Sequence, residues 1–195
     1  MKKYDKRKKG FSLVEMLVAL AIFSTISILL ATFLSQSLKA YRIRKEESDE
    51  QQKASHIMRE FEKTARAATE ILTADENELR FYRYFDLTSS SPTQIRYFIE
   101  GSEFKIGQTE PVGVEPNITY PQSAETIHLI VEDVENPNLI FQYFNGEKNT
   151  LSAPVDTTKI RLIKLTISLD QDPSKPPVAV TETTEVSLRN LKDNL

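Results

Sequence analysis

The segment from Phe11 to Leu34 constrains the fold of this chain more than any other stretch. It is 24 residues long, predominantly apolar, and contains one charged side chain, Glu15. A helix needs about 20 apolar residues to cross the hydrocarbon core of a bilayer, so this segment is long enough to span one. Its other polar residues are serines and threonines, which can hydrogen-bond to their own helix. A carboxylate inside a membrane segment is costly and usually marks a functional position with a partner.

Basic residues flank the apolar segment on both sides. Six precede it, namely Lys2, Lys3, Lys6, Arg7, Lys8 and Lys9, and four follow it, namely Lys39, Arg42, Arg44 and Lys45. The positive-inside bias from these counts is modest, and it favours a cytoplasmic N-terminus.

The net charge of −3 hides an asymmetry. Residues 1–10 contribute +5, because their six basic side chains are opposed only by Asp5, and the remaining side chains therefore sum to −8. An acidic chain of this kind is poorly suited to general nucleic-acid binding. The sequence contains no cysteine, which excludes a disulfide, a thiolate metal site and a cysteine nucleophile.

Three residues at the start of the apolar segment resemble the signature of the type IV pilin superfamily, which includes pilins and the pseudopilins of type II secretion and competence systems. That signature is a short basic leader ending in Gly, then Phe, then Glu at the fifth residue of the mature chain, then an apolar helix. Gly10, Phe11 and Glu15 stand at those positions. The resemblance implies that a prepilin peptidase cleaves between Gly10 and Phe11, that the new amino group of Phe11 is methylated, and that Glu15 helps to place the subunit against the N-terminus of a neighbour.

The resemblance also implies a location and a set of partners. Residues 1–10 would be a cleaved leader in the cytoplasm, residues 11–34 a transmembrane and filament-core helix, and everything after Leu34 would lie outside the cytoplasmic (inner) membrane. After assembly the chain would stand in an extracytoplasmic filament. The implied partners are other pilin or pseudopilin subunits, the prepilin peptidase and methyltransferase, and inner-membrane lipid; no small-molecule substrate is implied.

Two simpler interpretations of the N-terminus explain less. A secretory signal peptide has an apolar core of about 7–15 residues, which is shorter than this one. An ordinary signal anchor fits the length but accounts for neither Gly10 nor Glu15.

The helix is expected to continue beyond the membrane segment. No Gly or Pro occurs from Phe11 to Ser91, and these are the residues that most often break helices. The charged stretch from Arg42 to Lys53 is typical of a solvated helical face. Apolar residues then recur at steps of three and four, which predicts an amphipathic helix over residues 35–73 that ends near Leu72. The stripe consists of Ala54, Ile57, Met58, Phe61, Ala65, Ala68 and Leu72.

Residues 74–195 are predicted to form a globular head of antiparallel β-strands. The predicted strands are Leu79–Phe85, Gln94–Ile99, Glu103–Ile106, Thr126–Val131, Leu139–Phe144, Lys159–Leu169 and Val178–Leu191. The first three are expected to form a meander on the helix stripe, residues 107–125 to cross to a second part of the sheet, and Thr126–Val131 to pair with Leu139–Phe144. The fold class is therefore α+β, pilin-like, with a long N-terminal helix on an antiparallel sheet.

The head is similar in pattern to the J-type minor pseudopilins and W-type minor pilins, whose last strand often ends on an Arg-Asn pair, here Arg189 and Asn190. This resemblance and the absence of the cysteine loop of many major pilins favour a minor subunit over a major one.

The sequence argues against catalysis and against a bound cofactor. His56 and His128 have no nearby nucleophile or metal-ligand spacing, and five glycines do not form a phosphate loop. The acidic run Glu132, Asp133 and Glu135 is typical of a solvated edge. A calcium site in the loop Asp170–Gln171–Asp172 is conceivable, and Asn117–Ile118–Thr119 matches a glycosylation triplet.

Three function hypotheses remain from the sequence. The favoured one is a minor pilin or pseudopilin that assembles through its N-terminal helix into a filament used for secretion, DNA uptake (competence), adhesion or motility. The second gives the same anchor a binding head, for which Arg80, Arg83 and Arg96 among aromatic residues are the candidate surface. The third is an uncleaved single-span envelope protein with an extracytoplasmic β-rich head, whose N-terminus would lie before Gly10.

Overall fold

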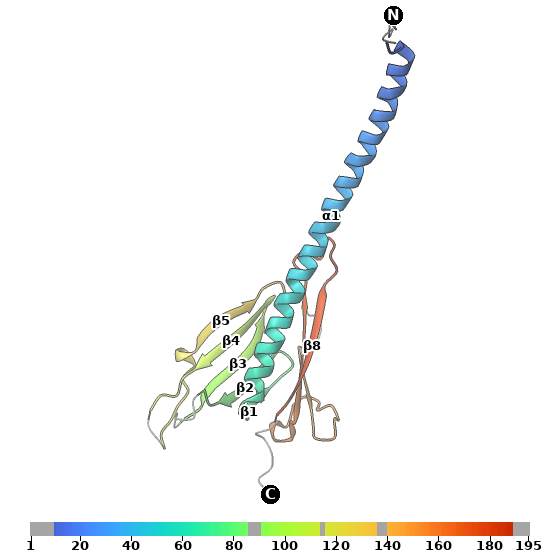
Figure 1. The fold of residues 1–195 in the computed structure, drawn as a ribbon. Helices are drawn as coiled ribbons and strands as arrows, with labels where there is room; N and C mark the ends of the chain where they lie inside the picture. The colour runs from blue at the N-terminus through green and yellow to red at the C-terminus, as the bar shows by residue number, and fades with distance from the viewer. Residues whose placement is uncertain (1–9, 86–90, 114–115, 136–139, 189–195) are drawn as a thin grey trace, which may run out of the picture. The chain divides into compact units, whose positions relative to one another are not determined.

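The computed structural model describes residues 10–85, 91–113, 116–135 and 140–188 (Figure 1). The chain divides into two compact units, one ending at Lys45 and one beginning at Glu46. The boundary falls within the single long helix α1, Leu13–Arg66. Residues from Glu46 onward contain the rest of α1 and both β-sheets, and they form the head.

The C-terminal part of α1 carries the predicted apolar stripe. Its side chains at Ala54, Ile57, Met58, Phe61 and Ala65 are all buried, with at most 6% of each residue exposed. The charged stretch before it is mostly exposed, as the sequence predicted. The helix is therefore amphipathic where it packs on the head, and this packing supplies the stability that helical propensity alone does not.

The prediction that the helix reaches Leu72 is wrong. The helix ends at Arg66, and residues Ala68–Ala74 form strand β1. Ala68, Ile71 and Ala74 are buried at a spacing of three, which is also the spacing of a helical stripe. In β1 this spacing arises from irregularities in its pairing with β2, between Ala68 and Glu70 and between Ile71 and Thr73.

The first five strands form one antiparallel sheet in the order β1-β2-β3-β4-β5, on which α1 lies (Figure 1). After β1 they are β2 Glu78–Arg83, β3 Thr93–Glu100, β4 Glu103–Thr109 and β5 Thr126–Val131. The predicted meander of three strands is confirmed as β2, β3 and β4. The sheet gains β1, which the sequence analysis had assigned to the helix.

The prediction that residues 107–125 cross to another part of the sheet is wrong. The chain returns after this loop, and β5 pairs antiparallel with β4. Tyr120 holds the loop by packing its ring 4.9 Å from that of Tyr82 and donating a hydrogen bond of 2.7 Å to the Pro92 carbonyl. The short 3-10 helix Gln122–Ala124 then leads into β5.

The last three strands form a separate sheet in the order β6-β7-β8. They are β6 Phe141–Phe144, β7 Leu162–Leu169 and β8 Val180–Ser187. The predicted pairing of Thr126–Val131 with Leu139–Phe144 is therefore also wrong. After β5, Asp133 takes a left-handed conformation with φ of 61°, and the buried Val134 bridges to Leu169 in the second sheet. The chain thus changes sheets where a hairpin was expected.

The core of the head lies between the α1 stripe and the inner faces of both sheets. The ring of Phe61 meets Tyr97 of β3 edge-on at 5.2 Å and Phe141 of β6 at 5.9 Å. The hydroxyl of Tyr143 in β6 donates a 2.7 Å hydrogen bond to the carbonyl of Asp75, and this bond joins the two sheets. Burial raises the pKa of Tyr97 to about 12, so its phenol remains protonated at neutral pH.

Replacing Phe61 by alanine is expected to lower the free energy of unfolding of the head by about 3–5 kcal/mol, because the cavity would open between both sheets and the helix. Urea unfolding of the full chain in mild detergent, followed by circular dichroism of the strands, measures this change. Arg59→Ala on the exposed side of the same helix is the matched control and should stay within about 0.5 kcal/mol. Equal effects of the two substitutions would contradict the central place of Phe61.

Candidate functional site

The predicted cleavage position lies just before α1, in a segment without helical or strand structure. Gly10 and Phe11 are both exposed, and 85% of Phe11 is accessible. A Cβ added at Gly10 would meet no atom within 4 Å, so the described residues leave this backbone open to approach. Residues 1–9, which the sequence analysis predicts to be part of a cleaved leader, lie outside the described part of the chain.

Glu15 lies in the first turn of α1 and takes part in a reciprocal pair of hydrogen bonds. Its backbone N–H donates to Ser12 Oγ at 3.2 Å, and its Oε2 accepts from the Ser12 backbone N–H at 2.9 Å. Ser12 is the residue before the helix, so the two residues form a capping box. The Ser-x-x-Glu spacing before an apolar run is visible in the sequence, but the sequence analysis gave Glu15 only an intermolecular role.

The capping box has a consequence for the mature chain. Both bonds use the amide and hydroxyl of Ser12, and cleavage after Gly10 would leave these groups unchanged. One carboxylate oxygen of Glu15 is thereby turned back toward the start of the chain. Glu15 therefore caps its own helix through Oε2.

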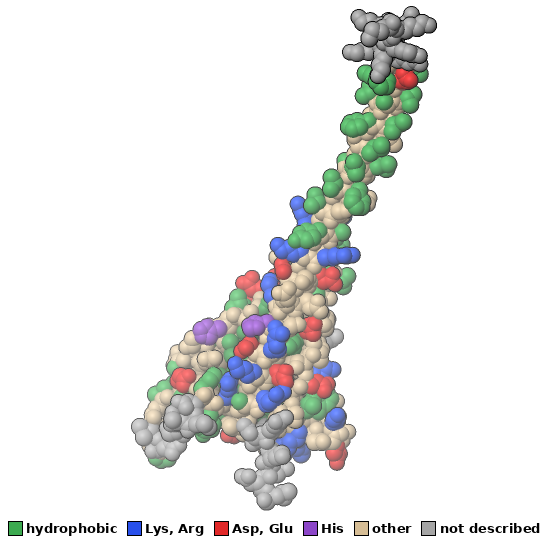
Figure 2. Space-filling view, viewed as in Figure 1, with side chains coloured by type: hydrophobic (Ala, Val, Ile, Leu, Met, Phe, Trp, Pro, Cys, Tyr) green, Lys and Arg blue, Asp and Glu red, His purple; other side chains and the backbone are tan. Residues whose placement is uncertain are grey.

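The helix that follows Glu15 is apolar on all sides. Its large side chains from Phe11 to Leu38 are each at least 50% exposed, and Figure 2 shows them along this part of α1. Four hydroxyls bond back to carbonyls one turn earlier, namely Ser24, Thr25, Ser27 and Thr32, at 2.7–2.8 Å. This part of α1 is long and apolar enough to cross a membrane. Glu15 is the only charged side chain from Phe11 to Leu38.

The candidate basic surface of the head is neutralised by its own neighbours. Arg80 and Arg96 stand opposite each other on β2 and β3 and share the carboxylate of Glu78 at 2.9 Å and 2.8 Å. Arg96 also reaches Glu125 at 3.4 Å and lies 4.0 Å from the Phe98 ring centre. These contacts give the arginines a structural role within the sheet.

Arg83 lies at the end of β2, with its guanidinium 4.4 Å from the ring centre of Phe85. Its neighbours in a hollow of about 450 Å³ include apolar residues of α1 and β4 and the carboxylate of Glu60. It does not join the pair formed by Arg80 and Arg96 with Glu78. The structure therefore does not assemble the three arginines into one open basic patch.

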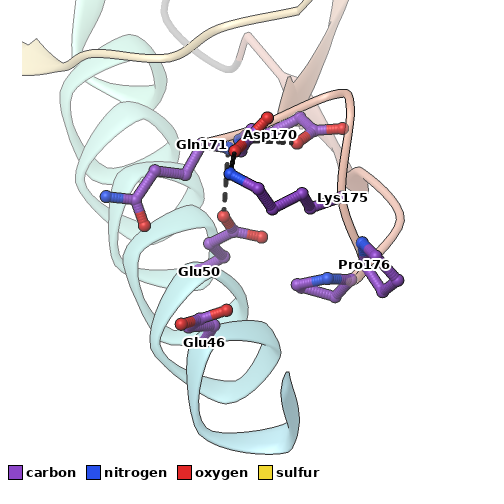
Figure 3. Close-up of a pocket in the computed structure, with 8 residues that line it drawn as sticks. Glu46, Glu50, Asp170, Gln171, Lys175 and Pro176 are labelled. Carbon is purple, nitrogen blue, oxygen red and sulfur yellow. Dashed lines mark hydrogen bonds and ion pairs between the residues drawn. The ribbon is translucent and has the colours of Figure 1, made fainter. Parts of the chain in front are cut away.

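The loop Asp170–Gln171–Asp172, which the sequence analysis considered as a calcium site, is attached to α1 by a hydrogen bond (Figure 3). The carboxylate of Glu50, which is 8% exposed, accepts a hydrogen bond of 3.2 Å from the Gln171 backbone N–H. Asp172 pairs with Lys175 and Ser174, and these partners lower its pKa to about 2. The carboxylates are thus used within the loop and in its attachment to the helix.

The other polar candidates are solvent-facing. His56 and His128 are exposed, as are Glu132, Asp133 and Glu135. Asn117 is also exposed in the loop before β5. Among the described residues no three histidine or acidic side chains are grouped so that they could hold a metal ion.

Comparison with known proteins identifies the N-terminal segment. Residues 5–31 match the family model of the prokaryotic N-terminal methylation motif. No curated protein matches the chain. Among solved structures, the type IV-like pilin TTHA1219 from Thermus thermophilus is similar at 13% identity and a TM-score of 0.41, over 74% of this chain and 97% of that one.

The matched segment contains Gly10, Phe11, Ser12, Glu15 and the start of α1. It is followed by one long helix packed on antiparallel sheets, as the fold class predicted. The chain therefore carries the prokaryotic N-terminal methylation motif at the start of a long helix, and that helix belongs to an α+β fold with antiparallel sheets.

Substituting Ser12 by alanine is expected to fray the first turn of α1. Loss of the Oγ acceptor costs about 0.5–2 kcal/mol, which corresponds to roughly fivefold faster amide exchange in this turn for a loss of about 1 kcal/mol. Hydrogen–deuterium exchange of the full chain in detergent, read by mass spectrometry, measures the effect.

Ser24→Ala is the matched control, because Ser24 only bonds back to the Leu20 carbonyl within the helix. It should leave exchange in the first turn unchanged, and Ser12→Thr should retain the cap. Unchanged exchange in Ser12→Ala would show that the capping box does not hold the start of the helix.

Proposed function

We propose that this chain is a minor pilin or pseudopilin, a low-copy structural subunit of a type IV pilus-like filament. The observation that carries the proposal is the match of residues 5–31 to the N-terminal methylation motif, with Gly10 and Phe11 exposed just before an apolar helix. The type IV pilin-like proteins are generally structural and not enzymatic, and the proposed activity is assembly.

In this mechanism a prepilin peptidase cleaves between Gly10 and Phe11, and the new amino group of Phe11 is methylated. The mature subunit then begins with a positive amine at Phe11, two residues before α1 begins at Leu13. The carboxylate of Glu15 pairs with the amine of a neighbouring subunit in the filament core. A charge buried in an apolar bundle is costly unless it is paired, so the amine and the carboxylate each select for the other.

The capping box prepares Glu15 for this pairing. The bond from the Ser12 N–H holds the carboxylate at 2.9 Å while the subunit is still alone in the membrane. One oxygen is then already placed at the helix start when the neighbour's amine arrives. Ser12 is therefore a positioning residue in the proposed docking step.

The proposed location follows from the same segment. The leader lies in the cytoplasm, the apolar part of α1 crosses the cytoplasmic membrane once, and the head lies outside. Its partners are other pilin or pseudopilin subunits, the prepilin peptidase and methyltransferase, and membrane lipid. The J-type or W-type subtype remains a proposal from the sequence pattern of the head, and the Arg189–Asn190 pair lies outside the described residues.

The intact mass of the membrane-extracted protein tests the proposal, in a host that contains a prepilin peptidase. We expect loss of residues 1–10 and the gain of one methyl group. Gly10→Ala should abolish both changes, because the peptidase reads the residue before the cut. A mass of precursor length in the unsubstituted chain would refute the processing step and favour an uncleaved single-span envelope protein.

A second experiment separates the charge of Glu15 from its capping role. Glu15→Gln keeps a side chain that can complete the capping box but removes the charge, whereas Glu15→Ala removes both. Glu15→Gln should keep slow amide exchange in the first turn of α1. The amount of this variant recovered in the sheared filament fraction should be at least tenfold lower than that of the unsubstituted chain. Filament recovery equal to the unsubstituted chain would show that the charge is not needed for assembly.

A further inference from the structure

Among the described residues, one edge strand of the head's two sheets has neither a covering element nor a charged side chain along its length. Unpaired edge strands can bind another strand, and proteins usually cover, shorten or charge them. The edge at β1 has the 3-10 helix Thr157–Lys159 against it, and β6 has four residues with a bridge to Thr150. The edge strand β8 carries Glu182 and Glu185. None of these devices is found at β5 among the described residues.

Strand β5 has the composition of a strand that pairs on both sides. Its sequence Thr-Ile-His-Leu-Ile-Val contains no acidic residue, lysine, arginine, proline or glycine. It pairs with β4 on one side only (Figure 1). Its residues are exposed or half-buried along the whole strand. A six-residue apolar strand of high β-propensity on an open edge is a site for strand addition.

The outer face of β5 shows why its side chains lack cover. Ile127 is 51% exposed and Leu129 is 48% exposed, and both point to the face away from α1. Ile127 stands opposite Gly107 of β4, which has no side chain to pack against it. The carboxylate of Glu125 occupies the space over Gly107 and turns toward Arg96. An apolar partner for Ile127 must therefore come from the open side of the strand.

We propose that β5 pairs antiparallel with β5 of a second copy of this chain, about a twofold axis at His128. In this register Ile127 of each copy stands opposite Leu129 of the other, and the paired stretch Ile127–Leu129 lies within the regular part of the strand. The two outer-face apolar residues are then mutually covered in both directions. No two acidic or two basic residues face each other, because the acidic residues Glu125 and Glu132 lie opposite apolar positions.

The bulge in β5 selects this register over its neighbours. Lys105 of β4 pairs with Leu129, but Phe104 pairs with Val131, so Ile130 is the extra residue. The regular part of the strand is therefore Thr126–Leu129, and Val131 no longer points to the face of Ile127. Moving the axis to Leu129 would place the bulge inside the new ladder. Moving it to Ile127 would set Leu129 against the carboxylate of Glu125.

The backbone of β5 is paired with β4 only, so its other edge has no partner strand among the described residues. A hollow of about 530 Å³ lies between α1 and the C-terminal end of β5, and it is lined by Lys53, His56 and Ile57 of α1 and by residues 129–133. A strand pair of this length buries less than the area of a standard stable interface, so the pairing is weak between dilute molecules. Two copies anchored in the same membrane have a higher effective concentration, which favours the contact.

A twofold contact of this kind closes on itself and does not propagate. It therefore differs from the head-to-tail contacts that extend a filament, and it goes beyond the function proposed above. It does not depend on cleavage of the leader, so the two proposals can fail independently.

Cysteine cross-linking of the full chain in detergent micelles tests the proposal, because the sequence has no cysteine of its own. On the axis the two His128 Cα atoms would be about 4.5–5.5 Å apart, within the range of a disulfide. His128→Cys should form a disulfide-linked dimer under mild oxidation. Thr183→Cys, in the middle of the exposed edge strand β8, is the matched control and should form at least tenfold less dimer.

Charge substitutions test the register itself. In the His128→Cys background, Leu129→Glu should reduce the dimer about tenfold, since it sets a carboxylate against Ile127 of the second copy. Adding Ile127→Lys to that variant should restore the dimer, because the introduced ammonium then faces the introduced carboxylate across the axis. Circular dichroism of each variant confirms that the head is folded.

Two outcomes would overturn the proposal. The first is equal dimer yield from His128→Cys and Thr183→Cys, which would show that association is not located at β5. The second is cross-linking of His128→Cys in the native host to a protein of a different mass, with no homodimer, which would show that another protein covers this edge. Restoration by the paired charges, together with a homodimer mass, supports the twofold pairing.

Discussion

The packing of one helix face against two sheets is the interaction on which the head depends. Phe61 is fully buried and contacts an aromatic ring from each sheet, Tyr97 in β3 and Phe141 in β6. The two sheets share no strand, and this helix face joins them into one core together with the Tyr143 hydrogen bond and the backbone bond from Phe141 to Glu76. The same helix continues toward its N-terminus with an apolar surface that the chain itself does not cover. One element therefore serves both as the core of the head and as the anchor.

The N-terminal segment combines local and intermolecular requirements in a few residues. Ser12 and Glu15 satisfy the first turn of α1 by capping it, and four hydroxyls in the apolar part satisfy themselves within the helix. The segment can therefore enter a membrane with its polar groups paired. The charge of Glu15 has no oppositely charged partner among the described residues of a single subunit. In the proposed function, pairing of this charge with the N-terminal amine of a neighbouring subunit directs assembly.

Much of the fold could be predicted from local sequence patterns, because helix formation, strand formation and burial of one face depend on residues close together in the chain. The absence of Gly and Pro indicated the long helix, alternation indicated most strands, and the spacing of the α1 stripe identified its buried residues from Ala54 to Ala65. The errors came where a pattern had two physical causes. Burial of Ala68 and Ile71 at a spacing of three looked helical, but it is produced by irregular strand pairing in β1. Pairing of β5 was assigned to the next strand because sequence order does not reveal the left-handed turn at Asp133.

By itself the sequence determined the anchor, the leader signature at Gly10, Phe11 and Glu15, and the α+β class, since each depends on residue type and spacing over a short range. The capping box was equally local and was readable from Ser12 and Glu15. Only the tertiary structure decided which charges neutralise one another, as when Glu78 and Glu125 gather around Arg96 from three separate segments. It alone also decided that β5 ends its sheet with an open edge. Both depend on strand order, which arises from contacts between residues far apart in the chain.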